Sequence, residues 1–528
     1  MSPTLGLQLL VVAAGAVGVA AVARRVGWPA PLLLVVAGLV VSPVVPAVPL
    51  EPELVLFVFL PPLLYSAALD SSYLRLRDVK RPVALLSIGL VLFTTAVVGL
   101  VVHLLLPGLP LALAFALGAI IAPPDAVAAV AVGRRLGLPR RSLTILIGES
   151  LFNDATALTA YRVALGAFTG GTVDLLDSTG QFLFAAVGGV AIGLALAFAF
   201  AWLFERTRDS LVENTLMLLI PFAAFLAAES VHASGVIAVV IVGLYLGNRM
   251  HLRGYGTRLV SGAVWKVTDF FLEAIVFALI GLQLVTVIEG ISGFGAWQVA
   301  GYAVAVLAVT ILSRFVWVFA VTSLMTVLSR GARLAPTRQQ SVILGWAGMR
   351  GVVSLAAAFA LPPGILPRDR AMLLFLTFTT VIGTLLIQGT TFPALIRRLG
   401  VSSAQEQYED RLAEAAAQQA ALEAGLAELE RLTGEQEGEP DEIQRQVIEQ
   451  LREKSWRRSL TAWERLGGGT GPGGAETPSA LYRRLRRDML QAEREVFVRL
   501  RDERRLDDEV LREVMAELDF EEAILERD

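Results

Sequence analysis

The stretch GESLFND, from Gly148 to Asp154, places two acids inside a run of residues that otherwise has the apolar character of a membrane-spanning helix. On insertion scales, one ionised carboxylate at the centre of a bilayer costs about 2.5–3.5 kcal/mol. Glu149 and Asp154 both lie in this stretch, and Asp125 in the preceding apolar run is a third such acid. Acids in this setting face protein or water and handle ions or protons, so the stretch indicates an ion-handling membrane protein.

The composition predicts an all-α polytopic membrane protein followed by a part of different character. The 528 residues are 55% hydrophobic, with a mean hydropathy of +0.64. Residues 401–528 hold 31 acids and 19 bases, whereas residues 1–400 hold 17 acids and 26 bases. We therefore predict a transmembrane domain over 1–400 and a cytoplasmic tail over 401–528. The absence of cysteine excludes disulfide bonds and thiolate metal sites.

Thirteen apolar runs are the predicted membrane spans. They lie near residues 5–23, 30–48, 53–70, 82–106, 111–133, 142–165, 180–204, 212–230, 234–249, 263–288, 297–327, 338–361 and 370–396. The loops between them alternate between arginine-rich segments and segments with almost no basic residue. The positive-inside rule then predicts a multi-pass protein of the cell membrane, with its N-terminus outside and its C-terminus in the cytoplasm.

The tail has the composition of solvated helices. Residues 404–432 and 481–527 are rich in Ala, Leu, Glu and Arg, which favour helix. Residues 467–480 are predicted to form a flexible, Gly-rich linker. Two roles stay open for the tail: a helical appendage or dimerisation arm, and a regulatory module that senses pH or a ligand.

Two of the runs carry residues that break helices. Residues 119–130 contain Pro123 and Pro124, which remove two backbone donors, and residues 345–358 are interrupted by glycines. These are the fifth and twelfth runs, so they are expected to cross the membrane in opposite directions. Interrupted helices at matching places in two halves are typical of inverted-repeat transporters that bind their substrate near the midplane.

An ion site rich in oxygen ligands is predicted around Asp154. Ser150 and Asp154 are four residues apart, so they share one face of a helix. Asp125, which would also compensate half-helix N-termini, and the backbone carbonyl freed at Pro124 complete a ligand set suited to a small hard cation. An Asp154 carboxylate that holds either a cation or a proton would couple the two. The alternative is a structural, hydrogen-bonded acid.

Glu149 is expected to point about 100° away from this site, toward a neutralising base. Arg350, which would also compensate half-helix C-termini, is the expected partner in a structural salt bridge. Arg314 lies inside the eleventh run and needs a buried acid of its own unless that span is offset. Asp269 and Glu273 in the tenth run are interpreted as an interfacial charge cluster, with a place in the ion path as the alternative.

Several motifs, in order, resemble the monovalent cation/proton antiporters of the sodium/proton exchanger family, in their bacterial form. The resemblance covers about residues 5–400 and rests on FLPPLLYSAALD (59–70), APPDAVAA (122–129), GESLFNDATAL (148–158), ALIGLQL (278–284) and GWAGMRGVVSLA (345–356). It implies a homodimer in which a core domain with two crossed, broken helices moves against a dimerisation domain, as an elevator.

The resemblance also implies roles for single residues. The acid that follows Asn153, here Asp154, would bind sodium or a proton, and Glu149 would pair with Arg350. Asn at position 153 suggests electroneutral exchange of one cation per proton. One departure bears on selectivity, because many members have Thr where this chain has Pro124, so a hydroxyl ligand is lost.

The predicted function is therefore secondary antiport of a monovalent cation, with sodium expected, against protons. The transported cation would be held by Asp154, Asp125 and Ser150, without a cofactor and without a nucleic-acid partner. Motifs for metalloproteases, P-loop ATPases and serine hydrolases are absent from the sequence, which argues against an enzyme. The alternatives are potassium/proton exchange, a channel-like conductance, and a membrane sensor that acts through the cytoplasmic tail.

Overall fold

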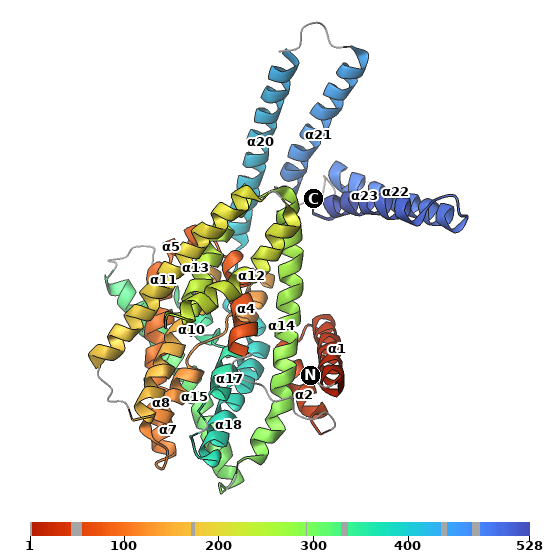
Figure 1. Cartoon of the computed structure of the whole chain (residues 1–528). Coiled ribbons are helices and arrows are strands. Elements are labelled where there is room, and N and C mark those ends of the chain that lie inside the picture. The colour runs from red at the N-terminus through yellow and green to blue at the C-terminus, as the bar shows by residue number, and fades with distance from the viewer. Residues whose placement is uncertain are drawn as a thin grey trace. The chain divides into compact units, whose positions relative to one another are not determined.

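The structure is a computed structural model that describes residues 3–43, 55–170, 175–207, 209–291, 293–328, 336–362, 364–434, 441–466 and 476–527. The chain divides into two compact units, Met1–Ser402 and Ser403–Asp528, and both are built from helices (Figure 1).

The helices of the first unit follow the predicted apolar runs. Most runs coincide with one helix or with a continuous series of helices, whereas the fifth and twelfth runs are each divided into two helices by a break. In chain order these elements are α1 (Pro3–Val26), α2 (Ala30–Val41), the π-helical η1 (Val55–Phe59), α4 (Leu60–Leu69), α5 (Tyr73–Asp78), α6 (Lys80–Ala84), η2 (Leu85–Leu90), α7 (Val91–Leu105), α8 (Leu111–Ile121), α9 (Val127–Arg135), α10 (Arg140–Phe168), α11 (Leu175–Arg206), α12 (Ser210–Glu229), α13 (Gly235–Asn248), η3 (Met250–Leu252), α14 (Tyr255–Glu289), α15 (Ala296–Leu328), α16 (Arg338–Trp346), α17 (Val352–Phe359), α18 (Pro367–Thr384), η4 (Leu385–Gly389) and α19 (Thr390–Leu399). The predicted stretches 44–48 and 53–54 lie outside the described residues.

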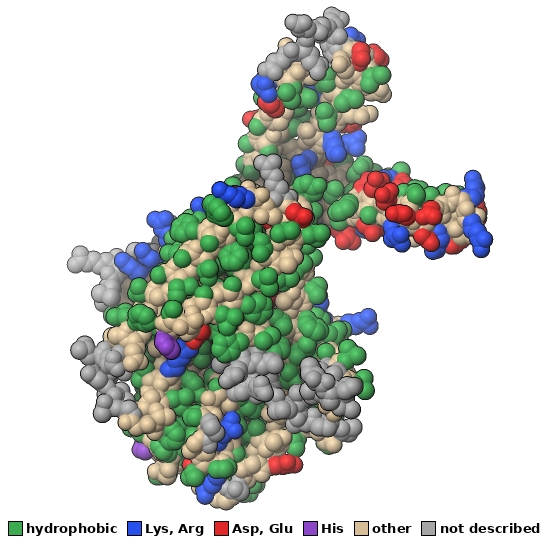
Figure 2. Space-filling view, viewed as in Figure 1, with side chains coloured by type: hydrophobic (Ala, Val, Ile, Leu, Met, Phe, Trp, Pro, Cys, Tyr) green, Lys and Arg blue, Asp and Glu red, His purple; other side chains and the backbone are tan. Residues whose placement is uncertain are grey.

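The helices of the first unit have the length and apolarity of membrane spans. Within the described residues, six helical stretches are long and apolar enough to cross a bilayer: Lys80–Leu105, Thr179–Arg206, Ser210–Glu229, Tyr255–Glu289, Ala296–Thr326 and Pro367–Leu399. Four more apolar helices are shorter. Hydrophobic side chains cover most of the side of this unit seen in Figure 2. Such a surface suits hydrocarbon as its solvent, because a soluble protein rarely exposes so large an apolar patch.

Glycines let several of these helices approach to backbone contact. A Cβ added at Gly38 of α2 would lie 2.6 Å from the carbonyl oxygen of Ala278 and 2.8 Å from the Cα of Gly281, both on α14. A Cβ at Gly118 of α8 would lie 2.3 Å from the carbonyl oxygen of Thr95 on α7. Helices that pack through small residues gain van der Waals contact, which drives association where no hydrophobic effect operates.

The two predicted helix breaks are present, and they meet. α8 ends at Ile121 and α9 begins at Val127, while α16 ends at Trp346 and α17 begins at Val352. The backbone N–H of Asp125 in the first break donates a 2.7 Å hydrogen bond to the carbonyl of Met349 in the second. A backbone donor of the first break is therefore paired with a backbone acceptor of the second, as buried backbone groups require.

The second unit consists of α20 (Ala404–Gly434), α21 (Glu442–Leu466), α22 (Pro478–Asp502) and α23 (Asp508–Arg527). The helix predicted at 404–432 is present, but α21 was not predicted. The helix predicted at 481–527 is interrupted after Asp502, where Arg504 adopts a left-handed backbone (φ 56°). Residues 467–475 of the predicted linker lie outside the described residues, and its last three residues begin α22.

The contact between the two breaks gives a test at Gly351. A Cβ at this position would lie 1.9 Å from Oδ2 of Asp125, so Gly351→Ala should push the breaks apart. We expect a loss of at least about 1–3 kcal/mol of stability, measured as a lower unfolding temperature of the purified protein in detergent. Gly389→Ala is the matched control, because its Cβ would meet nothing closer than 3.5 Å. Equal unfolding temperatures for the two variants would contradict the close approach.

Candidate ion-binding site

The GESLFND stretch lies in the middle of α10, which runs unbroken through it. Glu149 and Asn153 are 1% and 0% exposed, and they share one face of the helix. Ser150 and Asp154 share the neighbouring face, with Asp154 6% exposed. The helical spacing therefore separates the four polar side chains into two pairs, as the sequence predicted.

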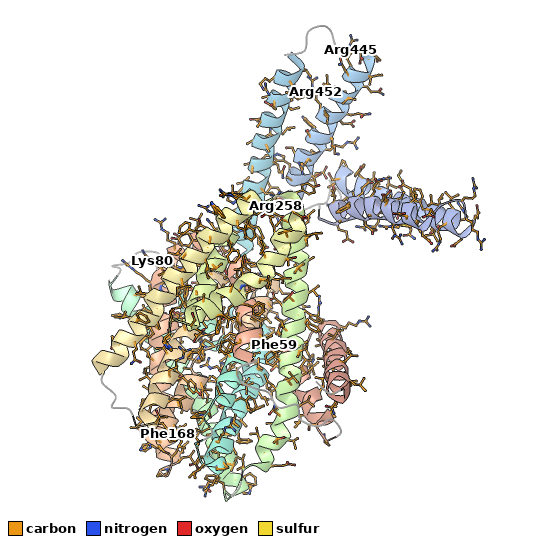
Figure 3. All side chains as sticks on the ribbon, viewed as in Figure 1. Phe59, Lys80, Phe168, Arg258, Arg445 and Arg452 are labelled. Atoms are coloured by element: carbon orange, nitrogen blue, oxygen red, sulfur yellow. The ribbon has the colours of Figure 1, made fainter. Side chains whose placement is uncertain are left out.

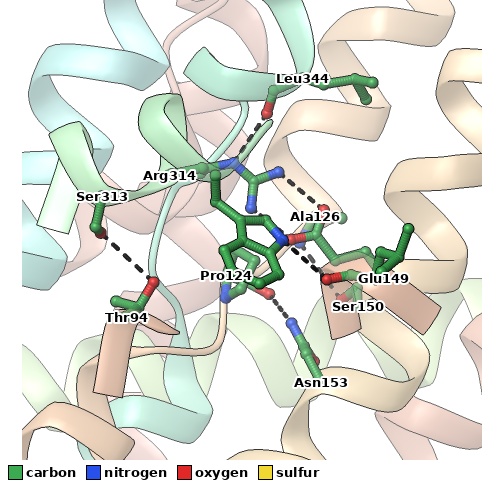
Figure 4. Close-up of polar contacts among 12 residues, drawn as sticks. Thr94, Pro124, Ala126, Glu149, Ser150, Asn153, Ser313, Arg314 and Leu344 are labelled. Atoms are coloured by element: carbon green, nitrogen blue, oxygen red, sulfur yellow. Dashed lines mark hydrogen bonds and ion pairs between the residues drawn. The ribbon is translucent and has the colours of Figure 1, made fainter. Parts of the chain in front are cut away.

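Two side chains of α10 hold the first helix break in place. Asn153 Nδ2 donates a 2.6 Å hydrogen bond to the carbonyl of Pro124, and the backbone N–H of Ala126 donates to Ser150 Oγ at 3.5 Å (Figure 4). The Pro124 carbonyl, which was predicted as an ion ligand, thus already accepts one hydrogen bond and has one lone pair left. Asn153 acts on the backbone of the break, which the sequence did not indicate.

Asp125 compensates a helix N-terminus, as predicted. Its Oδ1 accepts a 2.9 Å hydrogen bond from the backbone N–H of Val127, the first residue of α9. A carboxylate at this position satisfies a donor that has no partner within the helix and interacts favourably with the helix dipole. Its charge is thereby fixed beside the break.

Asp154 lies at a cavity of about 340 Å³, which the side chains of both breaks also line. Among the described residues, no donor is hydrogen-bonded to the Asp154 carboxylate. Asp125, Ser150 and Ser354 line the same cavity. Ser354 is 1% exposed, and its hydroxyl has no hydrogen-bond partner among the described residues. The cavity therefore presents oxygen atoms that the protein leaves available, and Ser354 is a member that the sequence did not single out.

The predicted salt bridge between Glu149 and Arg350 is wrong, because Arg314 takes that place. Nη2 of Arg314 donates to Oε2 of Glu149 at 2.8 Å, and Nη1 donates to Oε1, so the pair is bidentate (Figure 4). Both side chains are about 1% exposed. Arg314 Nε also donates to the carbonyl of Leu344 at 2.9 Å, close to the C-terminus of α16. Arg314 thus finds the buried acid that the sequence required for it.

Arg350 contributes a buried positive charge without that ion pair. Its Nη1 donates to the carbonyl of Gly348 at 2.9 Å, and its backbone N–H donates to Thr384 Oγ1 at 3.0 Å. Its Nε has no partner within the described part of the chain. The Arg350 side chain thus contacts the backbone of the break to which it belongs, whereas Arg314 reaches Glu149 from α15. Of the two buried arginines, Arg314 is the one that forms the bidentate pair with Glu149.

Asp269 and Glu273 of α14 line the same cavity as Asp154. The sequence left two interpretations of these acids open, an interfacial charge cluster and a place in the ion path, and the second requires them to lie at this cavity. Asp269 accepts a hydrogen bond from Ser66 of α4, and among the described residues its buried Oδ1 has no partner. α14 therefore contributes two acids to the cavity wall.

Within the parts of the chain that the structure describes, no three acidic or histidine side chains come close enough to hold a metal ion together. The oxygen atoms around this cavity belong to carboxylates, hydroxyls and a backbone carbonyl, which are the ligands that hard cations prefer.

These features, an all-helical membrane unit with two broken helices and an acid at their meeting point, define a secondary ion transporter. A family model described as "Sodium/hydrogen exchanger, transmembrane" matches residues 10–398. The chain belongs to this family of monovalent cation/proton antiporters.

The proteins to which the chain is similar are named as exchangers or antiporters of the same kind. An uncharacterised Na⁺/H⁺ exchanger of Mycobacterium tuberculosis is 34% identical, over 98% of this chain and 96% of its own. The low-affinity Na⁺/H⁺ antiporter NhaS1 of Synechocystis is 32% identical over 80% of each chain. A sodium, potassium, lithium and rubidium/H⁺ antiporter of Bacillus subtilis is 30% identical, over 70% of this chain and 58% of its own. The fold resembles the sodium/proton antiporter MjNhaP1 of Methanocaldococcus jannaschii, with a TM-score of 0.60, 21% identity and coverage of 75% of this chain and 97% of that one.

The ion pair gives a prediction that separates the two arginines. Arg314→Met should leave Glu149 charged, buried and without its bidentate partner, at a cost of about 3–5 kcal/mol. Arg350→Met should cost less, because Arg350 forms no ion pair with any of the described residues. Unfolding temperatures in detergent measure both. The double variant Glu149→Gln/Arg314→Met should recover most of the loss, and a double variant as unstable as Arg314→Met alone would contradict the pairing.

The acids of α14 give a second prediction. Asp269→Asn keeps an acceptor for Ser66 but removes a charge from the cavity wall, so the apparent KM for the cation should rise about threefold while the maximal rate holds. Glu289→Gln, on an exposed part of the same helix, is the control and should change neither value. Cation titrations of exchange in proteoliposomes measure both. An unchanged KM for Asp269→Asn would remove Asp269 from the ion path.

Proposed function

We propose that this protein exchanges one sodium ion for one proton, with the Asp154 carboxylate as the group for which the two compete. The observation that carries the proposal is the state of Asp154, which is buried, lines a cavity and receives no hydrogen bond from the described residues. A structural acid in the same place would be expected to have protein donors, because an unpaired buried carboxylate is costly. A carboxylate kept without donors is suited to a ligand that comes and goes.

The neighbouring oxygens support a cation as one of the two occupants. Asp125 and Ser150 line the same cavity, and the Pro124 carbonyl retains one lone pair. These are the carboxylate, hydroxyl and carbonyl ligands that small hard cations prefer. A proton on Asp154 would cancel the charge that attracts the cation, so each occupant excludes the other.

Charge balance supports a one-for-one, electroneutral exchange. Each of the two occupants brings one positive charge to the buried Asp154 carboxylate. Either a monovalent cation or a proton brings this group to neutrality. Asn153 adds no charge, so the loaded site would carry the same charge in both states. An empty site would stay charged, and moving it across the membrane would cost several kcal/mol, which suppresses leakage.

We further propose that α8 to α10 and α15 to α17 form a core that moves as an elevator past α4 and α14. The supporting contacts are the hydrogen bonds that tie α10 to the first break and the first break to the second. The two breaks would be the matching parts of an inverted repeat, and the dimerisation surface would lie on the other helices. The alternating basic loops support an N-terminus outside the cell membrane and a C-terminus in the cytoplasm.

The choice of cation rests on the relatives and on position 124. NhaS1 of Synechocystis is named for sodium, whereas the Bacillus subtilis protein is named for sodium, potassium, lithium and rubidium. Here the hydrogen bond from Asn153 fixes the Pro124 carbonyl beside the cavity. A fixed carbonyl in place of a mobile hydroxyl favours one cation size, and we propose sodium.

Exchange in proteoliposomes tests the proposal. Asp154→Asn should reduce cation-dependent proton movement to the level of empty liposomes, while Asp78→Asn, at an exposed position of α5, should leave it unchanged. The assay compares sodium, lithium and potassium, and proton movement is followed with an internal pH-sensitive dye.

The same liposomes test the stoichiometry. An imposed membrane potential should not alter the rate of an electroneutral exchange. Retained exchange in a folded Asp154→Asn protein would refute the role of Asp154. A rate that follows the potential would refute one-for-one exchange and leave the Asp154 assignment standing.

A further inference from the structure

A second cavity lies on the opposite side of α10 from the ion site. Its volume is about 560 Å³, and its walls come from α5, α6, η2, α10, α11 and α13. On α10 it is lined by Phe152, Ala155, Thr156 and Thr159, none of which lines the cavity at Asp154. The function proposed above does not use this space.

The lining of the cavity is mostly apolar with a basic end, which is complementary to a phospholipid. Most of its lining is apolar, including Val83, Ile88, Phe182, Ile237 and Leu244. Its charged members all lie at one end, where Arg77 near the end of α5 and Lys80 at the start of α6 are exposed. Figure 3 places Lys80 at the margin of the first unit.

The lining residues change from basic to apolar along the length of the helices. From Lys80 to Ile88, α6 and η2 run about 12 Å, and the lining residues change from basic to apolar over that length. α10 contributes lining residues over about another 10 Å, from Phe152 to Thr159. A slot of this length, basic at one end and apolar beyond, matches a headgroup followed by an acyl chain.

We propose that this cavity binds one anionic membrane phospholipid, with its phosphate at Arg77 and Lys80 and an acyl chain against α10. The charge of the two bases selects an anionic headgroup. The rest of the lining is mostly apolar, with four serine and threonine hydroxyls, and suits an acyl chain. Inorganic phosphate would satisfy the basic end alone and leave the rest of the slot unfilled.

The lipid would contact the helix that carries the ion site. Phe152 and Ala155 face the slot and flank Asn153 and Asp154 in the sequence. A chain wedged between α10 on one side and α11 and α13 on the other would favour one position of α10. This consequence for transport rests on the proposed antiport, whereas binding of the lipid does not.

Binding is tested by titrating the purified, delipidated full-length protein with phosphatidylglycerol, phosphatidylcholine or inorganic phosphate. Native mass spectrometry counts bound lipid, and the unfolding temperature reports stabilisation. Arg77→Ala/Lys80→Ala should weaken phosphatidylglycerol binding about tenfold. Arg75→Ala/Arg81→Ala is the matched control, because these bases belong to the same segment but do not line the cavity. Ala186→Trp, which fills the slot from α11, should block the chain without changing charge.

Each outcome decides the proposal. Selective loss of phosphatidylglycerol binding in Arg77→Ala/Lys80→Ala and in Ala186→Trp supports it. Equal loss in the control pair assigns the binding to general surface charge and overturns the cavity site. Equal stabilisation by inorganic phosphate, or a change in oligomeric state instead of lipid count, assigns the slot to a free anion or to a second copy of the chain. Loss of exchange in Asp154→Asn with lipid binding intact separates failure of the antiport proposal from failure of this one.

Discussion

The structure of the first unit depends on balancing charge where water is absent. Glu149 and Arg314 neutralise each other through a bidentate pair, and Asp125 is stabilised by the N-terminus of α9. Arg350 supplies a further positive charge between the two breaks. Asp154, by contrast, is buried and receives no hydrogen bond from the described residues. In the proposed exchange a cation or a proton would supply its positive partner, so the need to balance charge would bear on both the fold and the transported ion.

Much of the fold was predictable because its determinants are local. Apolar runs mark the helices, and Pro123-Pro124 and the glycines near Arg350 mark the breaks, since each removes a backbone donor or weakens a helix at a known place. The helix α21 and the turn after Asp502 were not predictable in the same way. Polar helices lack an apolar run, and an arginine in a left-handed conformation gives no signal of the kind that glycine gives.

The candidate site was predictable in its members but not in all of its pairings. Helical spacing places Ser150 and Asp154 on one face, and this needs no tertiary information. The partner of Glu149 depends on which arginine reaches it, and the sequence offers two. The place of Asp269 and Glu273 at the cavity was left open between two interpretations, because it depends on how α14 packs against α10. Both questions concern distances between helices, which a single sequence does not encode locally.

The backbone contact between Gly38 and Gly281 has a mechanical consequence. Two helices in backbone contact are held rigidly against each other. No side chains lie between them that could change rotamer, and the contact leaves little free volume for a shift. In the proposed elevator, α14 would then stay in place with α2, and Asp269 and Glu273 would stay with it. The displacement that exposes Asp154 alternately to the two aqueous phases would fall to the helices on the other side of the cavity, so the distance between Asp154 and the acids of α14 would change during each transport cycle.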